Sequence, residues 1–157
     1  MFYDLVDTPL GPVAVTSDEK GIRKIAFQQG KHPLRIEEHW QRDPKILNAA
    51  RRQLKAYFSG ELQDFDLMLA PAGTDFQQRV WRALRQIPYG HIVSYQDIAV
   101  AIGNPKACRA VGGANAKNPI PIIIPCHRVI GSQGQLVGYG EGLDIKKKLI
   151  DLERRYL

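Results

Sequence analysis

The first 27 residues alternate short apolar runs with turn-forming residues. β-Branched and aromatic side chains dominate 2–6, 12–17 and 21–27, and Pro9, Gly11 and the segment 18–21 separate them. Short runs of this kind, bounded by glycine, proline and aspartate, are typical of strands joined by tight turns. The pattern predicts a three-stranded β-meander at the start of the chain.

A helical period follows a polar, irregular stretch over 28–43, which has room for one short helix. Apolar residues recur at three- and four-residue spacing from Ile46 to Phe58, and Gly60 is suited to end that helix. The run 65–69 could return as a strand. These elements predict a small α+β domain over residues 1–69.

The segment Ala-Pro-Ala-Gly at 70–73 is a candidate linker, so the second domain is expected over 70–157. Thr74 and Gln77 have the spacing of a capping box, which predicts the start of a helix. Apolar residues continue this helix to Ile87, and the segment 88–90 should stop it.

Two short helices are expected next. Ser94 can cap the first, which should end at Gly103, and Asn104 can cap the second, with Pro105 at its first position and its end near Ala114. Two short helices joined by a Gly-Asn turn resemble a helix-turn-helix, a motif that binds DNA.

The second of these helices has an almost bare face of alanine and glycine. Lys106 and Arg109 are its only cationic side chains, and it has no amide side chain to read an adenine edge. Such a helix suits close approach to the minor groove or to the DNA backbone, with weak sequence preference. The alternative is that the small residues pack against another helix.

The most informative stretch is 120–129. Three isoleucines at 122–124 favour a buried strand, which Pro125 should end. Cys126 and His127 follow at once, so a thiol would sit at the end of a dry element beside a titratable base, as nucleophilic chemistry requires. The alternative is a structural cysteine beside a surface histidine.

A glycine-rich segment over 130–142 comes next, with a hairpin tip expected at 132–134. Tyr139 lies among the glycines, so backbone amides and one ring could line a pocket for a flat ligand. A final helix is predicted over 144–157.

Composition narrows the class of protein. Hydrophobic residues make up 44% of the chain, and no apolar run approaches the length of about 20 residues that spans a bilayer. We therefore expect a cytoplasmic protein whose Cys108 and Cys126 are reduced. Residues 70–157 hold 12 basic and 6 acidic residues, the whole net charge of +6, which suits a polyanionic partner. The alternative is a solvated basic surface that includes Lys146, Lys147 and Lys148.

The run Pro-Cys-His-Arg-Val at 125–129 resembles the signature of the O6-alkylguanine-DNA alkyltransferases. The resemblance extends in the same order from Thr74 to Glu153 and includes the segments 94–96, 103–106, 109–112, 118–119 and 138–139. It implies an α+β protein: a small RNase H-like sheet domain, then a mainly helical, winged-helix-like domain with a helix-turn-helix.

The same resemblance implies the catalytic roles. Cys126 would take the alkyl group from O6 of guanine, His127 would act on the thiol through a water molecule, and Glu153 would orient the far ring nitrogen. Tyr95 would help to rotate the nucleotide out and would protonate the leaving base. Asn118 would brace the turn around the active-site loop.

The remaining implied contacts are with the substrate. Arg109 would fill the space left by the flipped nucleotide, and the DNA-binding set would also include Tyr95, Gln96, Asn104, Lys106 and Ser132. Val129, Tyr139 and Gly140 would line the base pocket, with backbone carbonyls of residues 126 and 129 reading the guanine edge. Glu141 departs from the glycine or bulky residue common at this position and could alter tolerance for larger adducts.

The implied partner is duplex DNA containing O6-alkylguanine, bound through the minor groove by a monomer; activity on O4-alkylthymine stays open. No cofactor motif is present, and Cys108, Cys126 and His127 lack the pairing of a zinc site. Since nothing here could hydrolyse a thioether, each molecule should act once. Alternatives are a non-enzymatic DNA-binding regulator, a lesion sensor, or a cysteine hydrolase, although hydrolase partners usually lie far apart in sequence.

Overall fold

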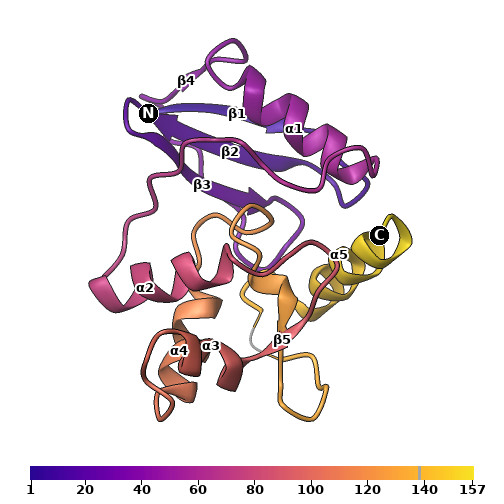
Figure 1. Cartoon of the computed structure of the whole chain (residues 1–157). Helices are drawn as coiled ribbons and strands as arrows, with labels where there is room; N and C mark the ends of the chain where they lie inside the picture. Colours follow the sequence, from indigo (N-terminus) through magenta and orange to yellow (C-terminus); the bar gives the residue numbers. More distant parts are fainter. Residues whose placement is uncertain (138) are drawn as a thin grey trace. The chain divides into compact units, whose positions relative to one another are not determined.

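The chain folds into two compact units, Met1–Ala72 and Gly73–Leu157, in a computed structural model that describes residues 1–137 and 139–157 (Figure 1). The boundary lies three residues after the one expected at 69/70. The Ala70 amide donates to the Ile22 carbonyl at 2.8 Å, which ties residue 70 to the first unit. A Cβ at Gly73 would lie 2.4 Å from the Trp81 ring, so residue 73 is packed within the second.

The first unit contains the predicted meander. Strands β1 (Phe2–Val6), β2 (Val13–Asp18) and β3 (Gly21–Phe27) pair antiparallel, and β4 (Gln41–Arg42) adds to β1 in parallel, giving the order β3-β2-β1-β4. Helix α1 (Asn48–Phe58) buries the apolar side chains that its helical period predicted: Ala50, Leu54, Tyr57 and Phe58.

Two expectations for this unit are wrong. The stretch 28–43 holds the short strand β4 and no helix, because residues 41 and 42 pair with the edge of β1. The run 65–69 forms only an isolated bridge between Leu69 and Ile22, not a strand. In both places pairing with a distant strand decided the outcome, which local composition does not encode.

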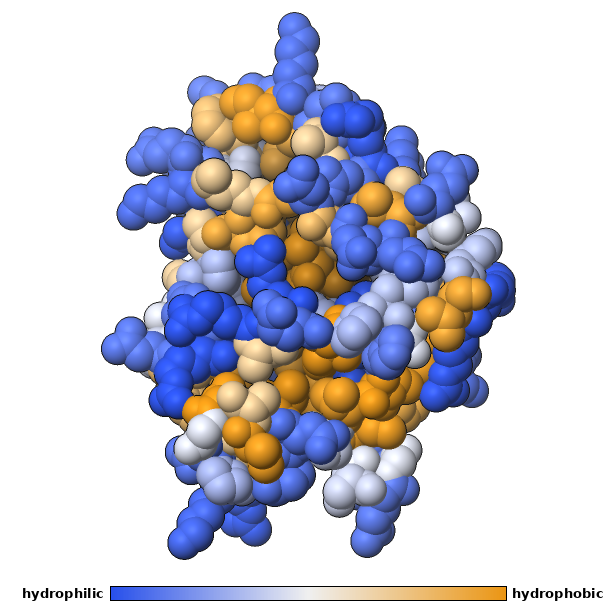
Figure 2. Space-filling view, in the orientation of Figure 1, coloured by the Kyte–Doolittle hydropathy of each residue, from blue (hydrophilic) through white to orange (hydrophobic). Residues whose placement is uncertain are grey.

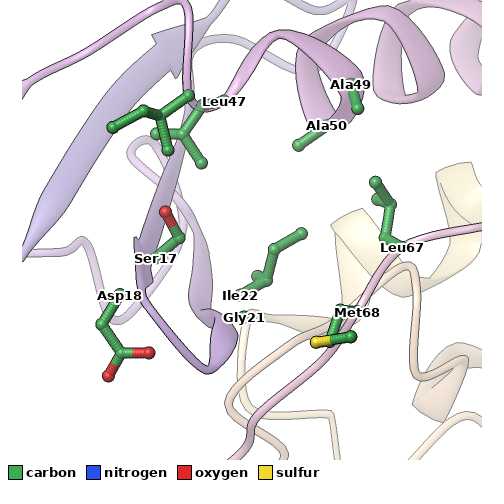
Figure 3. A pocket seen from close by; sticks show the side chains of 10 residues that line it. Ser17, Asp18, Gly21, Ile22, Leu47, Ala49, Ala50, Leu67 and Met68 are labelled. Carbon is green, nitrogen blue, oxygen red and sulfur yellow. The ribbon is translucent and has the colours of Figure 1, made fainter.

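A shallow pocket lies in the first unit, between the β2–β3 turn, the start of α1 and the segment that carries Met68 (Figure 3). Its walls include Ser17, Ile22, Leu47 and Ala50. The pocket has no cysteine, histidine or basic side chain among its lining residues, so it is separate from the nucleophile predicted in the second unit.

The second unit is mainly helical. Its elements are α2 (Asp75–Leu84), β5 (Val93–Ser94), α3 (Tyr95–Ala101), α4 (Cys108–Ala116), the single 3-10 turn η1 (Cys126–Arg128), β6 (Val129–Ile130) and α5 (Leu143–Arg155). The predicted capping box at Thr74 is present, and Ser94 caps α3 as predicted, where it forms a second capping box with Asp97. Strands β5 and β6 pair in parallel, which places the nucleophile segment next to the start of α3.

Helix α4 begins later than predicted. It starts at Cys108, with Ala107 before it and no side-chain cap, because residues 104–107 close a separate turn in which the Ala107 amide donates to the Asn104 carbonyl at 3.0 Å. Gly103 has φ +77°, the left-handed conformation expected of the turn between the helices.

The small residues of α4 divide between two environments. Val111 and Ala114 are buried, and the Trp81 indole nitrogen donates to the Ala114 carbonyl at 2.9 Å, which ties α4 to α2. No heavy atom lies within 4 Å of where a Cβ of Gly112 or Gly113 would be. The inner side therefore packs as a helix contact, and the glycine side stays open.

The predicted strand at 122–124 is also wrong. Its isoleucines are buried, but the segment 120–124 is a turn, closed by the Ile124 amide donating to the Ile120 carbonyl at 3.0 Å. Ile122 has φ +75°, which β-branched residues rarely adopt. The apolar run predicted that these isoleucines would be buried. It did not predict the turn, because the turn depends on the side chain of Asn118, which lies outside the run.

The face of the molecule in Figure 2 is mostly hydrophilic, with apolar side chains in separate patches. Among the described residues, no helix combines the length and apolar character needed to cross a membrane.

Candidate active site

Cys126 begins the 3-10 turn η1 directly after Pro125 and is 3% exposed. Its amide donates to the Ile124 carbonyl at 2.8 Å, and the Asn115 side-chain amide donates to its own carbonyl at 3.3 Å. The peptide groups on either side of the thiol are therefore held by the preceding turn and by α4. This anchoring fixes where the sulfur lies.

Burial raises the pKa of the Cys126 thiol to about 11, although a hydrogen bond with Asn118 and the positive charge of Lys146 both work to lower it. The negative charge of Glu141 acts in the same direction as burial. The resting residue is consequently a neutral thiol, which needs a base to become the reactive thiolate.

His127 is fully buried, and its Nε2 lies 2.5 Å from Glu153 Oε2 on α5. Arg128 donates to the same carboxylate through Nε at 2.8 Å and Nη2 at 3.0 Å, and the Gly90 amide donates to Oε1 at 3.0 Å. Burial alone would raise the pKa of Glu153, but the hydrogen bonds and charges of His127 and Arg128 outweigh it and lower that pKa below the ordinary range. Glu153 is therefore an anion.

An anionic acceptor at Nε2 selects the tautomer in which Nε2 carries the proton. His127 Nδ1 is buried and makes no hydrogen bond with any residue that the structure describes. Burial also lowers the pKa of His127, against the influence of Glu153, so the ring is neutral. A neutral imidazole with a free lone pair on Nδ1 can accept a proton.

Asn118 braces the turn that precedes the nucleophile. Its side-chain amide donates to the Ile124 carbonyl at 2.7 Å, and its oxygen accepts from the Ile120 amide at 2.9 Å. The two bonds span the residue with positive φ, Ile122. Asn118 thereby stabilises the unusual backbone that presents Cys126.

The Tyr95 hydroxyl donates to the Val137 carbonyl at 2.5 Å. Burial, together with negative charge at Cys126, raises the pKa of Tyr95 to about 12. The phenol therefore keeps its proton at neutral pH and is a donor. Tyr95 is the first residue of α3 and directly follows the N-cap Ser94. Ser94 is also the last residue of β5, which pairs with β6.

Strand β6 and the segment after it carry the predicted pocket residues. Val129 and Tyr139 are buried, and Ser132 is exposed. A Cβ at Gly140 would lie 2.5 Å from the Ala116 carbonyl oxygen at the end of α4, so only glycine fits this close approach. Gly138, part of the resemblance, lies outside the described residues.

Apart from Ser132, which follows β6, the side chains predicted to bind DNA lie on or between α3 and α4. Gln96, Asn104, Lys106 and Arg109 are all exposed. The Gln96 amide donates to the Pro105 carbonyl at 3.0 Å, so it also links α3 to the turn before α4.

Sequence reasoning missed two buried cations. Arg128 was treated only as part of the motif, yet it clamps Glu153 and donates through Nη1 to the Ile87 carbonyl at 2.7 Å. Lys146 was included in a solvated basic run, and this is wrong, because its side chain is fully buried while Lys147 and Lys148 are exposed. Its seven-residue spacing from Glu153 places both on one helix face, a signal that could have identified it.

No group of three or more histidine, cysteine, aspartate or glutamate side chains suited to a metal ion occurs in the described part of the chain. Both cysteines are free. Fold and site together define a two-unit protein in which a buried cysteine is followed by a buried histidine–glutamate pair, in the same unit as two short helices joined by a turn.

Family models cover both units. The model described as 6-O-methylguanine DNA methyltransferase, DNA binding domain, matches residues 75–155, and the ribonuclease-like domain model of the same family matches residues 1–71. These matches confirm the predicted family and the predicted α+β fold, in which a ribonuclease-like domain precedes a DNA-binding domain. The chain belongs to the 6-O-methylguanine DNA methyltransferase family.

Individual relatives agree over nearly the full length. The methylated-DNA–protein-cysteine methyltransferase of Methanosarcina barkeri is 54% identical, with 100% of this chain and 99% of the relative covered. The constitutive enzyme of that name from Bacillus subtilis is 44% identical over 98% of this chain and 95% of its own. The crystal structure of Mycobacterium tuberculosis OGT in complex with DNA superposes with a TM-score of 0.91 at 46% identity, covering 99% and 94% of the two chains.

Proposed function

We propose that this protein repairs DNA by transferring the alkyl group of O6-alkylguanine to its own Cys126. The observation that carries this proposal is the buried pair in which His127 Nε2 lies 2.5 Å from Glu153 Oε2, directly after the free thiol of Cys126. Relatives named methylated-DNA–protein-cysteine methyltransferase support the same chemistry.

The reaction begins with removal of the thiol proton. His127 Nδ1 takes it through a bridging water molecule, and the anionic Glu153 stabilises the imidazolium that forms. The sulfur then attacks the alkyl carbon in line, forming a carbon–sulfur bond while the bond from that carbon to guanine O6 breaks. Tyr95, which holds its proton at neutral pH, protonates the leaving base.

The target base must leave the duplex to reach this thiol, because Cys126 is buried. The exposed side chains of the helix-turn-helix, with Arg109 entering the vacated stack, would hold the DNA. Gln96, Asn104, Lys106 and Ser132 would contact the backbone. The open glycine side of α4 suits approach to the minor groove, which is the groove we propose.

Transfer consumes the protein. The product is a thioether, whose carbon–sulfur bond water does not cleave under ordinary conditions. We propose that each monomer acts once, in the cytoplasm, where reducing conditions keep Cys126 free. All the proposed catalytic groups come from one chain, so a monomer suffices.

Intact mass after incubation with an O6-methylguanine oligonucleotide tests this function. We expect a gain of one methylene mass, located at Cys126 by peptide mapping, with at most one methyl group moved per protein under excess DNA. Cys108→Ala should react normally and Cys126→Ala should not, while both should still bind duplex DNA. Methyl transfer in the Cys126→Ala protein, or none in the wild type, would contradict the proposal and favour a binding-only regulator or sensor.

A further inference from the structure

Lys146 is a buried cation that forms no ion pair with a carboxylate in the part of the chain that the structure describes. Its side chain, on the second turn of α5, is fully buried, a rare state for a lysine unless it is paired. None of the ion pairs among the described residues involves it. A buried charge costs free energy unless neighbouring groups stabilise it, so the contacts of the Lys146 ammonium group indicate its role.

Its contacts converge on the candidate active site. Lys146 Nζ donates to the Val137 carbonyl at 2.7 Å and lies 5.7 Å and 6.0 Å from the ring centroids of Tyr95 and Tyr139. The Tyr95 hydroxyl donates to the same Val137 carbonyl at 2.5 Å. A carbonyl has two lone pairs, and here a cation and the proposed proton donor occupy both.

Charge links the same lysine to the nucleophile. A positive Lys146 lowers the pKa of Cys126, and a negative Cys126 raises the pKa of Lys146, so each charged form favours the other. Burial opposes both and brings the pKa of Lys146 down to about 8. The other titratable groups that face the pair are Tyr95, His127, Tyr139 and Glu141, of which only Glu141 opposes the thiolate with a full negative charge.

We propose that Lys146 is a positioning residue for alkyl transfer, whose ammonium group holds the Val137 carbonyl and the Tyr95 ring in place and directs positive charge toward the Cys126 thiolate. The alkyl-transfer part of this inference rests on the proposed function; the effect on the thiol does not.

The test replaces Lys146 by Met, which keeps the stem and removes the charge, and by Gln, which keeps a donor for Val137 without charge. Lys147→Met is the matched control, since it makes the same change at an exposed position of the same helix. All variants carry Cys108→Ala, so that Cys126 is the single thiol. Thermal melting confirms folding, and if the Met protein fails to fold, the Gln protein carries the test.

Two readouts are needed. The first is the rate of Cys126 alkylation by iodoacetamide at pH 7, below the pKa of Lys146, which needs no DNA; we expect this rate to fall about tenfold in both Lys146 variants, because the fraction of thiolate at that pH falls tenfold. The second is the single-turnover rate on O6-methylguanine DNA, which should fall at least tenfold with Met and less with Gln.

Folded Lys146 variants with the iodoacetamide rate and the methyl-transfer rate of the control would overturn the inference. A fall in the methyl-transfer rate with an unchanged iodoacetamide rate would overturn the electrostatic part and retain only the positioning of Tyr95 and Val137. If the unmutated protein moved no methyl group at all, the proposed function would fail, while the iodoacetamide rate at pH 7 would still decide the role of Lys146.

Discussion

The Glu153 carboxylate and the His127 imidazole, 26 residues apart in sequence, meet at 2.5 Å between Glu153 Oε2 and His127 Nε2 in the buried part of the second unit. Arg128 holds the same carboxylate through two further bonds. One acidic side chain on α5 therefore orients the His127 ring, directly after Cys126 in the sequence, and neutralises a buried guanidinium.

Glu153→Gln should lower both activity and stability. The amide keeps the size of the side chain but leaves Arg128 without its counter-charge, and breaking a buried ion pair from one side costs about 3–5 kcal/mol. We expect urea unfolding to show a loss of that order and single-turnover alkyl transfer to slow by a factor of about 100, within the range that general-base groups contribute. Asp151→Asn, at an exposed position of the same helix, is the control and should change neither.

Acid should destabilise the folded protein through the same pair. The pKa values of His127 and Glu153 are lowered in the folded state, so the unfolded chain binds more protons as the pH falls. Their stabilisation is present above the unfolded values of about 6.5 and 4.3 and is lost on acidification. Urea unfolding between about pH 7 and pH 3 should show a falling free energy of unfolding. Below about pH 4.3 the fall should be shallower in Glu153→Gln, which has no carboxylate to protonate at that position; an identical slope in the two proteins over that range would disprove this assignment.

Asn118→Ala should loosen the nucleophile. It removes the bonds to Ile120 and Ile124 that hold the left-handed Ile122, and leaving such buried peptide groups unpaired costs about 1–3 kcal/mol. We expect a lower melting temperature and slower alkyl transfer. Asn104→Ala, at an exposed turn position, should leave the melting temperature unchanged. Equal melting of the two variants would contradict the bracing role.

Gly140→Ala should displace the pocket segment, because the new Cβ would lie 2.5 Å from the Ala116 carbonyl oxygen. Crowding of this kind costs about 1–3 kcal/mol, so we expect lower stability and slower transfer. Gly112→Ala is the contrasting control. Open space surrounds its Cβ position inside α4, and replacing a glycine there should raise stability by about 0.5–1 kcal/mol. The same sign of change in both variants would refute the close-approach argument.

Local patterns determined much of the fold. The meander, helix α1 and the helix caps at Thr74 and Ser94 depend on neighbours a few residues away, so the sequence predicted them directly. The predictions for the start of α4 and for a strand at 122–124 were wrong, because turns competing for the same backbone hydrogen bonds replaced the expected cap and the expected strand.

The sequence by itself determined that a cysteine followed by a histidine stands after a buried apolar run, and which family the motif belongs to. Only the tertiary structure decided that Ile122 sits in a left-handed turn, that Arg128 clamps Glu153, and that Lys146 is buried while Lys147 and Lys148 are not. The physical reason is range: helix period and capping act within a few residues, whereas burial and charge pairing depend on which distant side chains the fold brings together.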